Sequence, residues 1–420
     1  MKKYSILLIT LFMVNGGIAQ SCLPQGITFT TQGQIDNFQI NYPNCTQIEG
    51  YVFITGSDIT NLNGLSVLTS IADSLIIKFT SLTNLTGLDN LTSIGGDIGI
   101  GYNNVLTSLI GLGNLTYLDS SLYIYHNYAL TSLTGLNNIT SIGDYLWIDY
   151  NSVLTSLTGL DNVASIGSFL KIEWNNNLTS LTGIENLTYI GGGMTISVCV
   201  NLTNLTELEN LTSIGGFLYF YNCIGLNSLA GLHNLTSIGG HLIFYYTGLS
   251  NLTGLENLTS IGSNLIIYEN PYLTSLTGLD NIDASSIVVL TIAENPLLST
   301  CAVQSICDYL AGNGGAAIYN NASGCNSEKE IESACGVGME ENNPSKNQLN
   351  IFPNPAYTNI TIETIITGHL YILNLNGQEL LQQEITETTT TIDIITLPSG
   401  VYFIKLINNK TVEVGKLIKK

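Results

Sequence analysis

Aromatic side chains with a polar edge recur along this chain, beside short stretches in which apolar residues alternate with other types. This alternation predicts β-strands, in which the residues between the apolar ones face solvent. Both tryptophans and nine of the 22 tyrosines fall on the predicted outward face. Tyr and Trp combine flat apolar area with a hydrogen-bonding group, which suits stacking on sugar rings or anchoring a protein partner.

This outward face is therefore the candidate ligand-binding surface, for a glycan or a protein. Its candidate residues are Tyr102, Tyr123, Tyr125, His126, Trp147, Tyr150, Lys171, Glu173, Trp174, Tyr219, Tyr221, Tyr245, Tyr246 and Tyr268. Thr195, Ser197 and Val198 interrupt the aromatic run and divide it in two. A second interpretation needs no ligand, because aromatic residues favour strands and stack across them.

Other kinds of chemistry have less support in the sequence. The four histidines are scattered without zinc-ligand spacing, and no nucleophile elbow, phosphate-binding loop or calcium loop occurs. Asp149 and Glu173 would lie one repeat apart on the outward face, which is thin evidence for a pair of polysaccharide-cleaving carboxylates. We therefore expect no enzyme activity, no metal and no cofactor.

A repeated phrase supplies the elements that would position the aromatic face. The phrase is Leu-x-Gly-Leu, and it occurs ten times at intervals of 23 or 24 residues, with Glu207 once in place of the glycine. The copies begin at Leu62, Leu85, Leu109, Leu133, Leu157, Leu181, Leu205, Leu229, Leu252 and Leu276. A period this constant means that one unit stacks on copies of itself, because a single copy cannot bury its apolar side alone.

The other half of each repeat reads apolar-x-apolar-x-x-Asn, as in Ile98 to Asn103. A strand followed by Asn indicates a turn in which the Asn side chain hydrogen-bonds to buried backbone groups. Stacked repeats would therefore place these Asn residues in a ladder. Thr80 and Thr247 replace the ladder residue in the two 23-residue repeats. A second Asn column, at positions 90 to 281, predicts a second laddered turn.

The strand-and-Asn pattern resembles the bacterial leucine-rich repeat. The full 24-residue repeat of this chain contains Leu-Thr-Ser-Leu-x-Gly-Leu-x-Asn-Leu-Thr-Ser-Ile-Gly. This sequence is most similar to the receptor L-domain variant of the leucine-rich repeat. The resemblance covers about Tyr51 to Thr300 and implies a solenoid of about eleven coils. One extra residue follows the Asn, compared with the commonest spacing, so we expect short strands and turns, with little helix, opposite the main strands.

Two cysteines occupy the ladder position in neighbouring repeats, Cys199 and Cys223. Stacked strands lie about 4.8 Å apart, a separation that a disulfide tolerates. The alternative is that each Cys simply replaces Asn as a small buried turn residue, as the leucine-rich-repeat pattern permits. The sequence leaves both possibilities open.

Charge excludes several kinds of partner. All 11 basic residues are lysines, and only three of them lie between Cys22 and Ser345, against 25 acidic residues, for a net charge near −22. A polyanion gains nothing from counterion release, so nucleic acids and anionic membranes are excluded as partners. No segment after the N-terminus has the 18 or more apolar residues that would predict a membrane span.

The N-terminus predicts export. Residues 1–19 read as a signal peptide, with Lys2 and Lys3 before an apolar run and small residues before Gln20. Cys22 raises the alternative of a lipoprotein, but the residues before it do not fit a lipobox. An exported chain reaches an oxidising compartment, where disulfides form.

The remaining cysteines predict disulfide-linked caps, because the open ends of a solenoid expose apolar rungs and unpaired backbone. Residues 20–50 form the predicted front cap, with one disulfide between Cys22 and Cys45. The predicted solenoid spans residues 51–300, and the rear cap spans 301–336. The rear cap holds two disulfides among Cys301, Cys307, Cys325 and Cys335, for which three pairings are possible.

Two helices are predicted in the rear cap. The first runs over residues 302–310, with Val303, Ile306 and Leu310 on one face. The second begins after Ser327, where Ser327 and Glu330 fit a capping box.

The repeat text ends before a predicted linker at residues 337–348. Residues 349–420 alternate as short strands between turns, which predicts a small β-sandwich with a hairpin at residues 371–378. This segment resembles the type A C-terminal sorting domain of the bacterial type IX secretion system, on Pro353 to Pro355, Asn374 to Gly377, Pro398 to Tyr402 and the basic tail from Lys416. The resemblance implies a Gram-negative cell and contact with the secretion machinery. An ordinary adhesion-type sandwich is the alternative.

Together these observations predict a mainly β protein: a leucine-rich-repeat, L-domain-like solenoid of ~24-residue coils with disulfide caps and a small C-terminal sandwich. We expect it to be secreted or held on the outer cell surface. As a function, we expect an adhesin or recognition module that uses the aromatic strand face. The alternative is a structural surface or matrix component with no specific ligand.

Overall fold

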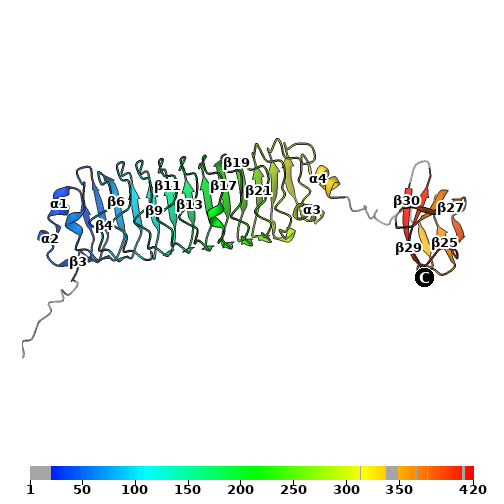
Figure 1. Cartoon of the computed structure of the whole chain (residues 1–420), viewed down its shortest axis with the longest axis horizontal. Helices are drawn as coiled ribbons and strands as arrows, with labels where there is room; N and C mark the ends of the chain where they lie inside the picture. The colour runs from blue at the N-terminus through cyan, green and yellow to red at the C-terminus, as the bar shows by residue number, and fades with distance from the viewer. Residues whose placement is uncertain (1–19, 313, 337–348, 365–366, 376, 409–411) are drawn as a thin grey trace, which may run out of the picture. The chain divides into compact units, whose positions relative to one another are not determined.

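A computed structural model describes residues 20–312, 314–336, 349–364, 367–375, 377–408 and 412–420 (Figure 1). The predicted signal peptide and linker lie outside these residues. The chain divides into two compact units, Met1–Val337 and Gly338–Lys420, which are described separately. Within the described residues, no helix is long and apolar enough to cross a membrane.

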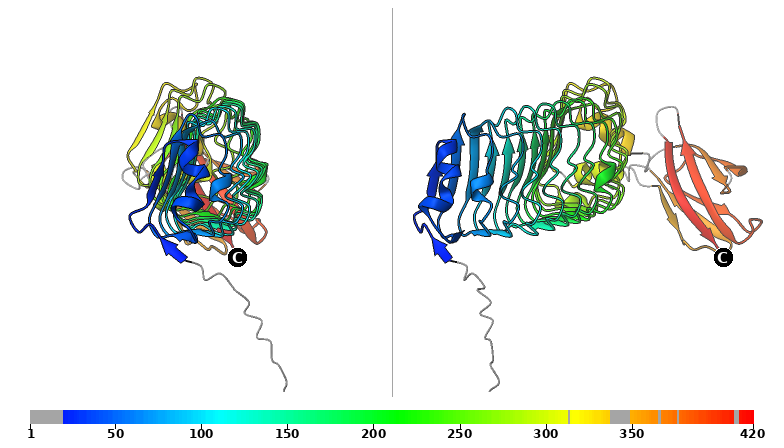
Figure 2. Two further views of the ribbon diagram at one scale, coloured as in Figure 1. Left: turned by 90° about the vertical axis from the view of Figure 1, so that its left-hand side faces the viewer. Right: turned by 60° about the vertical axis from the view of Figure 1, so that its left-hand side comes forward.

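The first unit is a solenoid whose coils stack along one axis, as Figure 2 shows. Its main sheet has 13 parallel strands in chain order within the described residues. They are β2 (Ile27–Phe29), β4 (Val52–Gly56), β6 (Leu75–Thr80), β8 (Ile98–Gly101), β9 (Leu122–Tyr125), β11 (Leu146–Asp149), β13 (Leu170–Glu173), β15 (Met194–Ser197), β17 (Leu218–Cys223), β19 (Leu242–Thr247), β21 (Leu265–Tyr268), β22 (Leu290–Ala293) and β23 (Ala316–Tyr319). Each strand continues the backbone pairing of the coil before it.

Short strands also occur in a second part of the coils, and helix is sparse there, as expected. One four-stranded sheet comprises β1 (Gln20–Cys22), β3 (Cys45–Ile48), β5 (Ser70–Ile71) and β7 (Ser93–Ile94). One six-stranded sheet comprises β10 (Ser141–Ile142), β12 (Ser165–Ile166), β14 (Tyr189–Ile190), β16 (Ser213–Ile214), β18 (Ser237–Ile238) and β20 (Ser260–Ile261). Three single 3₁₀ turns are η1 (Asn63–Leu65), η2 (Thr206–Leu208) and η3 (Ala284–Ser286).

Residues 24 apart become vertical neighbours, as the period predicts. Ile124, Ile148 and Ile172 pair in register on adjacent strands, and none of the three is exposed. The inward apolar residues of successive coils form one continuous core. Because every coil buries its apolar side against the next, the fold needs no long-range crossing of the chain.

The predicted Asn ladder is present inside the turns. The buried amide of Asn127 accepts the backbone N–H of Asn103 at 3.1 Å and donates to the carbonyl of Ile100 at 3.0 Å. In a short repeat, the Thr80 hydroxyl donates to the amide oxygen of Asn103 at 2.8 Å. These bonds satisfy backbone groups that the turn would otherwise bury without partners. The second Asn column is also laddered, as where Asn138 Nδ2 donates to the carbonyl of Gly113 at 2.7 Å.

The close stacking of the coils explains why glycine occupies the third position of Leu-x-Gly-Leu. Gly111 has a φ of 122°, and a Cβ there would collide with the Leu85 carbonyl of the preceding coil. Only glycine combines this backbone conformation with so close an approach. Where Glu207 replaces the glycine, the coil forms the 3₁₀ turn η2; the first copy, which keeps its glycine, forms the similar turn η1.

The caps extend the main sheet, because β2 comes from the front cap and β23 from the rear cap. The cap sequences lack the repeated phrase, so the repeat did not predict these two strands. The front cap also carries α1 (Gln32–Asp36) and α2 (Phe38–Asn41), and its disulfide joins Cys22 to Cys45. Thr31 and Gln34 form a capping box on α1 that the sequence analysis did not identify.

The rear cap holds two disulfides, and the structure resolves their pairing as Cys301–Cys325 and Cys307–Cys335. Its helices are α3 (Gln304–Ala311) and α4 (Glu328–Cys335), close to the predicted ranges. Val303, Ile306 and Leu310 are buried, which confirms the predicted apolar face of the first helix.

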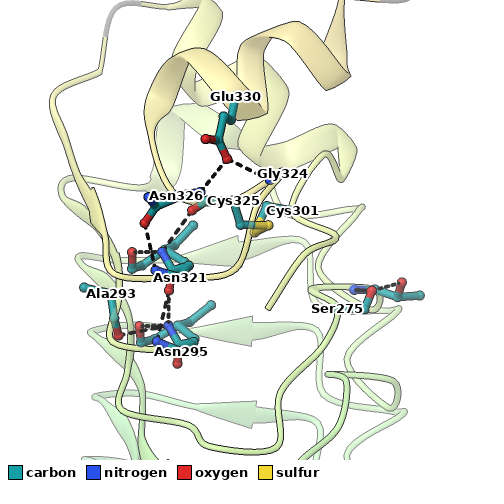
Figure 3. The surroundings of a disulfide bond; sticks show 12 residues. Ser275, Ala293, Asn295, Cys301, Asn321, Gly324, Cys325, Asn326 and Glu330 are labelled. Carbon is teal, nitrogen blue, oxygen red and sulfur yellow. Dashed lines mark hydrogen bonds between the residues drawn. A yellow bond between two sulfur atoms is a disulfide. The ribbon is translucent and has the colours of Figure 1, made fainter. Parts of the chain in front are cut away.

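The predicted capping box on α4 forms only in part. The Ser327 hydroxyl accepts the backbone N–H of Glu330 at 3.3 Å. The Glu330 carboxylate instead accepts the backbone N–H groups of Gly324 and Asn326, at 2.7 and 3.0 Å (Figure 3). The carboxylate therefore fixes the turn that holds Cys325, next to the last ladder residue, Asn321.

Cys199 and Cys223 are free and buried, so the structure favours simple replacement of Asn over a disulfide. Each thiol donates to a carbonyl of the preceding coil, Cys199 to Ile172 at 3.6 Å and Cys223 to Ile196 at 3.3 Å. Asn127 donates to Ile100 with the same spacing of 27 residues. The thiols thus occupy the place of the ladder amides.

The second unit contains two antiparallel sheets around its own core. The three-stranded sheet comprises β24 (Asn350–Phe352), β25 (Asn359–Glu363) and β28 (Thr389–Asp393). The four-stranded sheet comprises β27 (Glu379–Ile385), β26 (Gly368–Leu373), β29 (Gly400–Ile407) and β30 (Val412–Lys419). Strands β26 and β27 pair antiparallel, which confirms the predicted hairpin.

Candidate functional site

The outward face of the main sheet is organised in three columns, each with one residue per coil. The first outward column is the second residue of each strand: Ile76, Gly99, Tyr123, Trp147, Lys171, Thr195, Tyr219, Ile243 and Ile266. The second outward column is the fourth residue: Lys78, Gly101, Tyr125, Asp149, Glu173, Ser197, Tyr221, Tyr245 and Tyr268. The corner column is the residue just before the Asn ladder: Phe79, Tyr102, His126, Tyr150, Trp174, Val198, Asn222, Tyr246 and Glu269.

The corner column has left-handed backbone in every one of these coils, with φ between 51° and 57°. Five successive aromatic rings of this column form a continuous stack. The ring centroids of Phe79, Tyr102, His126, Tyr150 and Trp174 follow one another at 4.8, 4.6, 4.6 and 5.0 Å, with planes within 14° of parallel. Left-handed backbone costs a non-glycine residue about 1–2 kcal/mol, which a stacked pair worth about 0.5–1.5 kcal/mol can largely offset.

The stack has a consequence for ligand binding. The faces of Tyr102, His126 and Tyr150 each lie against a neighbouring ring on both sides. A sugar stacks on an exposed ring face, so these three residues offer only their edges. Four predicted site residues, the three named here and Trp174, thus have a structural explanation that requires no ligand.

The two outward columns form a hollow on the same face. A cavity of about 390 Å³ is lined by Ile76, Lys78, Asp97, Gly99, Tyr102, Tyr123, Tyr125, His126, Trp147 and Asp149. Its size falls in the range of small-molecule pockets, roughly 300–1,000 Å³. The lining combines aromatic rings with a few polar groups, which is the composition expected of a ligand site.

The hollow exists because β8 reads Ile-Gly-Ile-Gly and so carries no outward side chain. A Cβ at Gly101 would collide with the ring of Tyr125, which lies over that glycine from the next coil. A Cβ at Gly99 would meet only the end of the Ile76 side chain, at 2.9 Å from its Cδ1. The space above Gly101 is therefore filled by Tyr125, whereas the space above Gly99 belongs to the cavity.

Two lining residues have buried polar atoms that lack partners. Within the described residues, Trp147 Nε1 and Asp149 Oδ1 are buried and form no hydrogen bond. Asp149 points outward but is only 8% exposed, between the longer side chains of Tyr125 and Glu173, so it is not the solvent-facing residue that alternation predicted. Burial raises the pKa of Asp149 to about 7; the charge of Glu173 adds to the rise, and the Tyr150 N–H opposes it.

Both lysines of the coils lie at this end of the outward face. Lys78 Nζ is 5.3 Å from the centroid of the Tyr125 ring, and Lys171 Nζ is 5.8 Å from that of the Trp147 ring. Cations over aromatic faces at this range are attracted to the rings. The two ammonium groups thus flank the aromatic part of the cavity in an otherwise acidic array.

The remaining candidates form a separate group. Tyr221 lies 6.0 Å from Tyr219 and 5.1 Å from Tyr245, and Tyr245 lies 5.2 Å from Tyr268, measured between ring centroids. The coil of Thr195, Ser197 and Val198, all at most 6% exposed, separates this group from the cavity. Tyr246 is 42% exposed and lies in the corner column beyond the five-ring stack.

Sequence reasoning missed four residues of the cavity: Ile76, Lys78, Asp97 and Gly99. A signal for them was present, because aligning the coils shows glycine at both outward positions of one strand only. Outward aromatic and polar side chains predict contacts with a ligand, whereas this hollow depends on side chains that are absent. No group of three or more His, Cys, Asp or Glu that could hold a metal ion occurs among the residues described.

Three family models match this chain. Residues 117–242 and 172–286 match the BspA type leucine rich repeat region, in six copies, and residues 44–162 match the receptor L domain. Residues 350–420 match the secretion system C-terminal sorting domain. No curated protein matches the chain. The chain therefore carries leucine-rich repeats similar to those of the BspA type and of receptor L domains, followed by a type IX secretion sorting domain that directs it to the cell surface or outside the cell.

Proposed function

We propose that the protein is an exported recognition module that binds its ligand on the outward face of the main sheet, at the cavity above β8. The observation that carries the proposal is the cavity itself, about 390 Å³ in volume and lined by aromatic rings and polar groups. Rings alone would be consistent with structural stacking. A hollow between them leaves aromatic area without a protein partner.

Electrostatics support a binding role at this end of the face. The coils are strongly acidic, yet Lys78 and Lys171 both lie beside the cavity rings. Trp147 Nε1 and Asp149 Oδ1 are buried without partners, an arrangement that costs about 1–3 kcal/mol per group. Such local costs are common where a site is built for a ligand rather than for stability.

We assign the protein a binding role and no catalytic one. Asp149 and Glu173 are register partners on adjacent strands, but Asp149 is almost fully buried. A pair of carboxylates that cleaves a glycosidic bond must reach both sides of that bond. This pair lies side by side on one surface.

The alternative is a structural surface component with no specific ligand, and one observation favours it. The five-ring corner stack gives much of the aromatic stripe a role in stability alone. The two functions differ at the cavity, where a structural component would gain nothing from the missing side chain at Gly99.

The two tryptophans give a matched test, because Trp147 lines the cavity and Trp174 ends the corner stack. The mature chain would be screened on glycan and protein arrays, and every ligand found would be titrated against Trp147→Ala and Trp174→Ala. We expect Trp147→Ala to weaken binding by about tenfold or more, and Trp174→Ala by about threefold at most. The absence of saturable binding, or equal losses in the two variants, would refute the proposal.

A further inference from the structure

Gly99 lines the cavity, and the only atoms within 4 Å of a Cβ placed there belong to the Ile76 side chain. In the first outward column, Ile76, Gly99 and Tyr123 follow one another in register on β6, β8 and β9. Adjacent strands lie about 4.8 Å apart, so the backbones that carry Ile76 and Tyr123 are about 9.6 Å apart. One side chain is missing between them.

The neighbouring corner column shows what such a gap accommodates. Its rings stack at one per coil, with centroids 4.6 to 5.0 Å apart. A ligand ring above Gly99 would occupy the level of a missing side chain, with Ile76 on one side and Tyr123 on the other. The rings of Tyr123 and Trp147 meet edge to face, at 6.1 Å between centroids, on the side of Tyr123 away from Gly99.

Polar groups lie at both ends of this slot. Asp97, two residues before Gly99, points to the same side of the strand; its Oδ1 accepts from Ser120 Oγ at 2.5 Å and the Ser121 N–H at 3.1 Å. Lys78, at the other end, is held over the Tyr125 ring. A carboxylate can accept from a hydroxyl, and an ammonium group can donate to one.

The apolar walls and the charged ends of the slot favour some ring-shaped ligands over others. A pyranose ring has an apolar C–H face for Tyr123 and Ile76, and hydroxyls around its edge for Asp97 and Lys78. An apolar aromatic ring would leave both end groups without partners, at a cost in affinity. The end groups carry opposite charges, and the acidic coils repel anions, so uronic or sialic acids and nucleotides are disfavoured.

From this geometry we infer that the slot above Gly99 is a subsite for one neutral sugar ring, stacked on Tyr123 and hydrogen-bonded at its edge by Asp97 and Lys78. The inference rests on the proposed binding function and specifies its ligand class. It also gives the glycine a function: Gly99 keeps open the place that the sugar occupies.

The test fills the slot. Gly99→Val puts a strand-compatible side chain into the space, where the only atoms within 4 Å of its Cβ belong to the Ile76 side chain. Thr291→Val is the matched control, because Thr291 lies in the same column at the far end of the sheet and changes little in volume. Both variants and the unmodified mature chain would be titrated on an array of neutral and acidic glycans, with circular dichroism to check folding.

We expect the unmodified chain to bind neutral glycans, Gly99→Val to weaken this binding by about tenfold or more, and Thr291→Val to leave it unchanged. If Gly99→Val fails to fold, the double variant Gly99→Ala/Asp97→Asn takes its place. We expect this double variant to weaken binding by the same factor. Full binding by the filled slot, or binding of acidic glycans or proteins alone, would overturn the inference and leave the proposed function intact. No saturable binding by the unmodified chain would instead remove the proposed function.

Discussion

Asp149 offers the sharpest test of the electrostatics of the cavity. Burial raises its pKa from 3.8 to about 7, so the folded protein keeps a proton that the unfolded chain releases. Stability is therefore lost as the pH rises from about 4 to about 7, and the full penalty is present above pH 7. Asp149→Asn removes the titrating group and nearly preserves its shape.

The magnitude follows from the shift. A change of one pKa unit corresponds to 1.36 kcal/mol, so the whole shift is worth about 4 kcal/mol as an upper limit. By the linkage relation, the free energy of unfolding falls by about 2.5 kcal/mol of this total between pH 5 and pH 8. Because the cavity admits solvent beside the carboxyl group, we expect a change of about 1–2.5 kcal/mol over this interval.

The assay is urea unfolding of the mature chain at pH 5, 6, 7 and 8, which stays above the sequence pI of about 4.3. The free energy of unfolding of Asp149→Asn, minus that of the unmodified chain, should grow with pH and level off above pH 7. Asp119→Asn, at an exposed position, is the control for loss of one charge. Glu173→Gln should reduce the pH dependence in part, since the Glu173 charge contributes to the raised pKa. A pH-independent difference for Asp149→Asn would refute the account of a buried, protonated carboxyl group.

Three further predictions concern the coils. Asn151→Ala leaves buried backbone groups without partners and should lower the free energy of unfolding by about 2–4 kcal/mol, measured by urea titration; an unchanged value would contradict the ladder's role. Gly111→Ala should cost about 2 kcal/mol or more and Gly113→Ala almost nothing, because only the first glycine has a positive φ and a backbone carbonyl in the way. Cys199 and Cys223 should resist alkylation in the folded chain, and non-reducing unfolding should release two thiols; fewer would indicate a bridge.

The solenoid could be predicted from the sequence because the same residue pattern recurs every 23 or 24 residues. A 24-residue repeat fixes which residues become vertical neighbours, and the change from Asn103 to Thr80 in a short repeat keeps the same frame. The cap strands β2 and β23 lay outside the repeat text, so no period pointed to them. Their pairing depends on the edge that the neighbouring coil presents, which is a tertiary effect.

The candidate site was predictable in part. Alternation identified Tyr123, Tyr125 and Trp147, which line the cavity. It did not separate them from Tyr150 and Trp174, because alternation does not reveal the left-handed corner that turns those rings into a stack. Burial of Asp149 also could not be predicted, since it depends on the length of side chains one coil above and below.

The most direct test of the central claim is a crystal structure of the mature chain with a neutral glycan selected on the array. The account predicts one sugar ring above Gly99, between Ile76 and Tyr123, with its hydroxyls bonded to Asp97 and Lys78. A sugar bound at the tyrosine group around Tyr221, or one that leaves the slot empty, would contradict it.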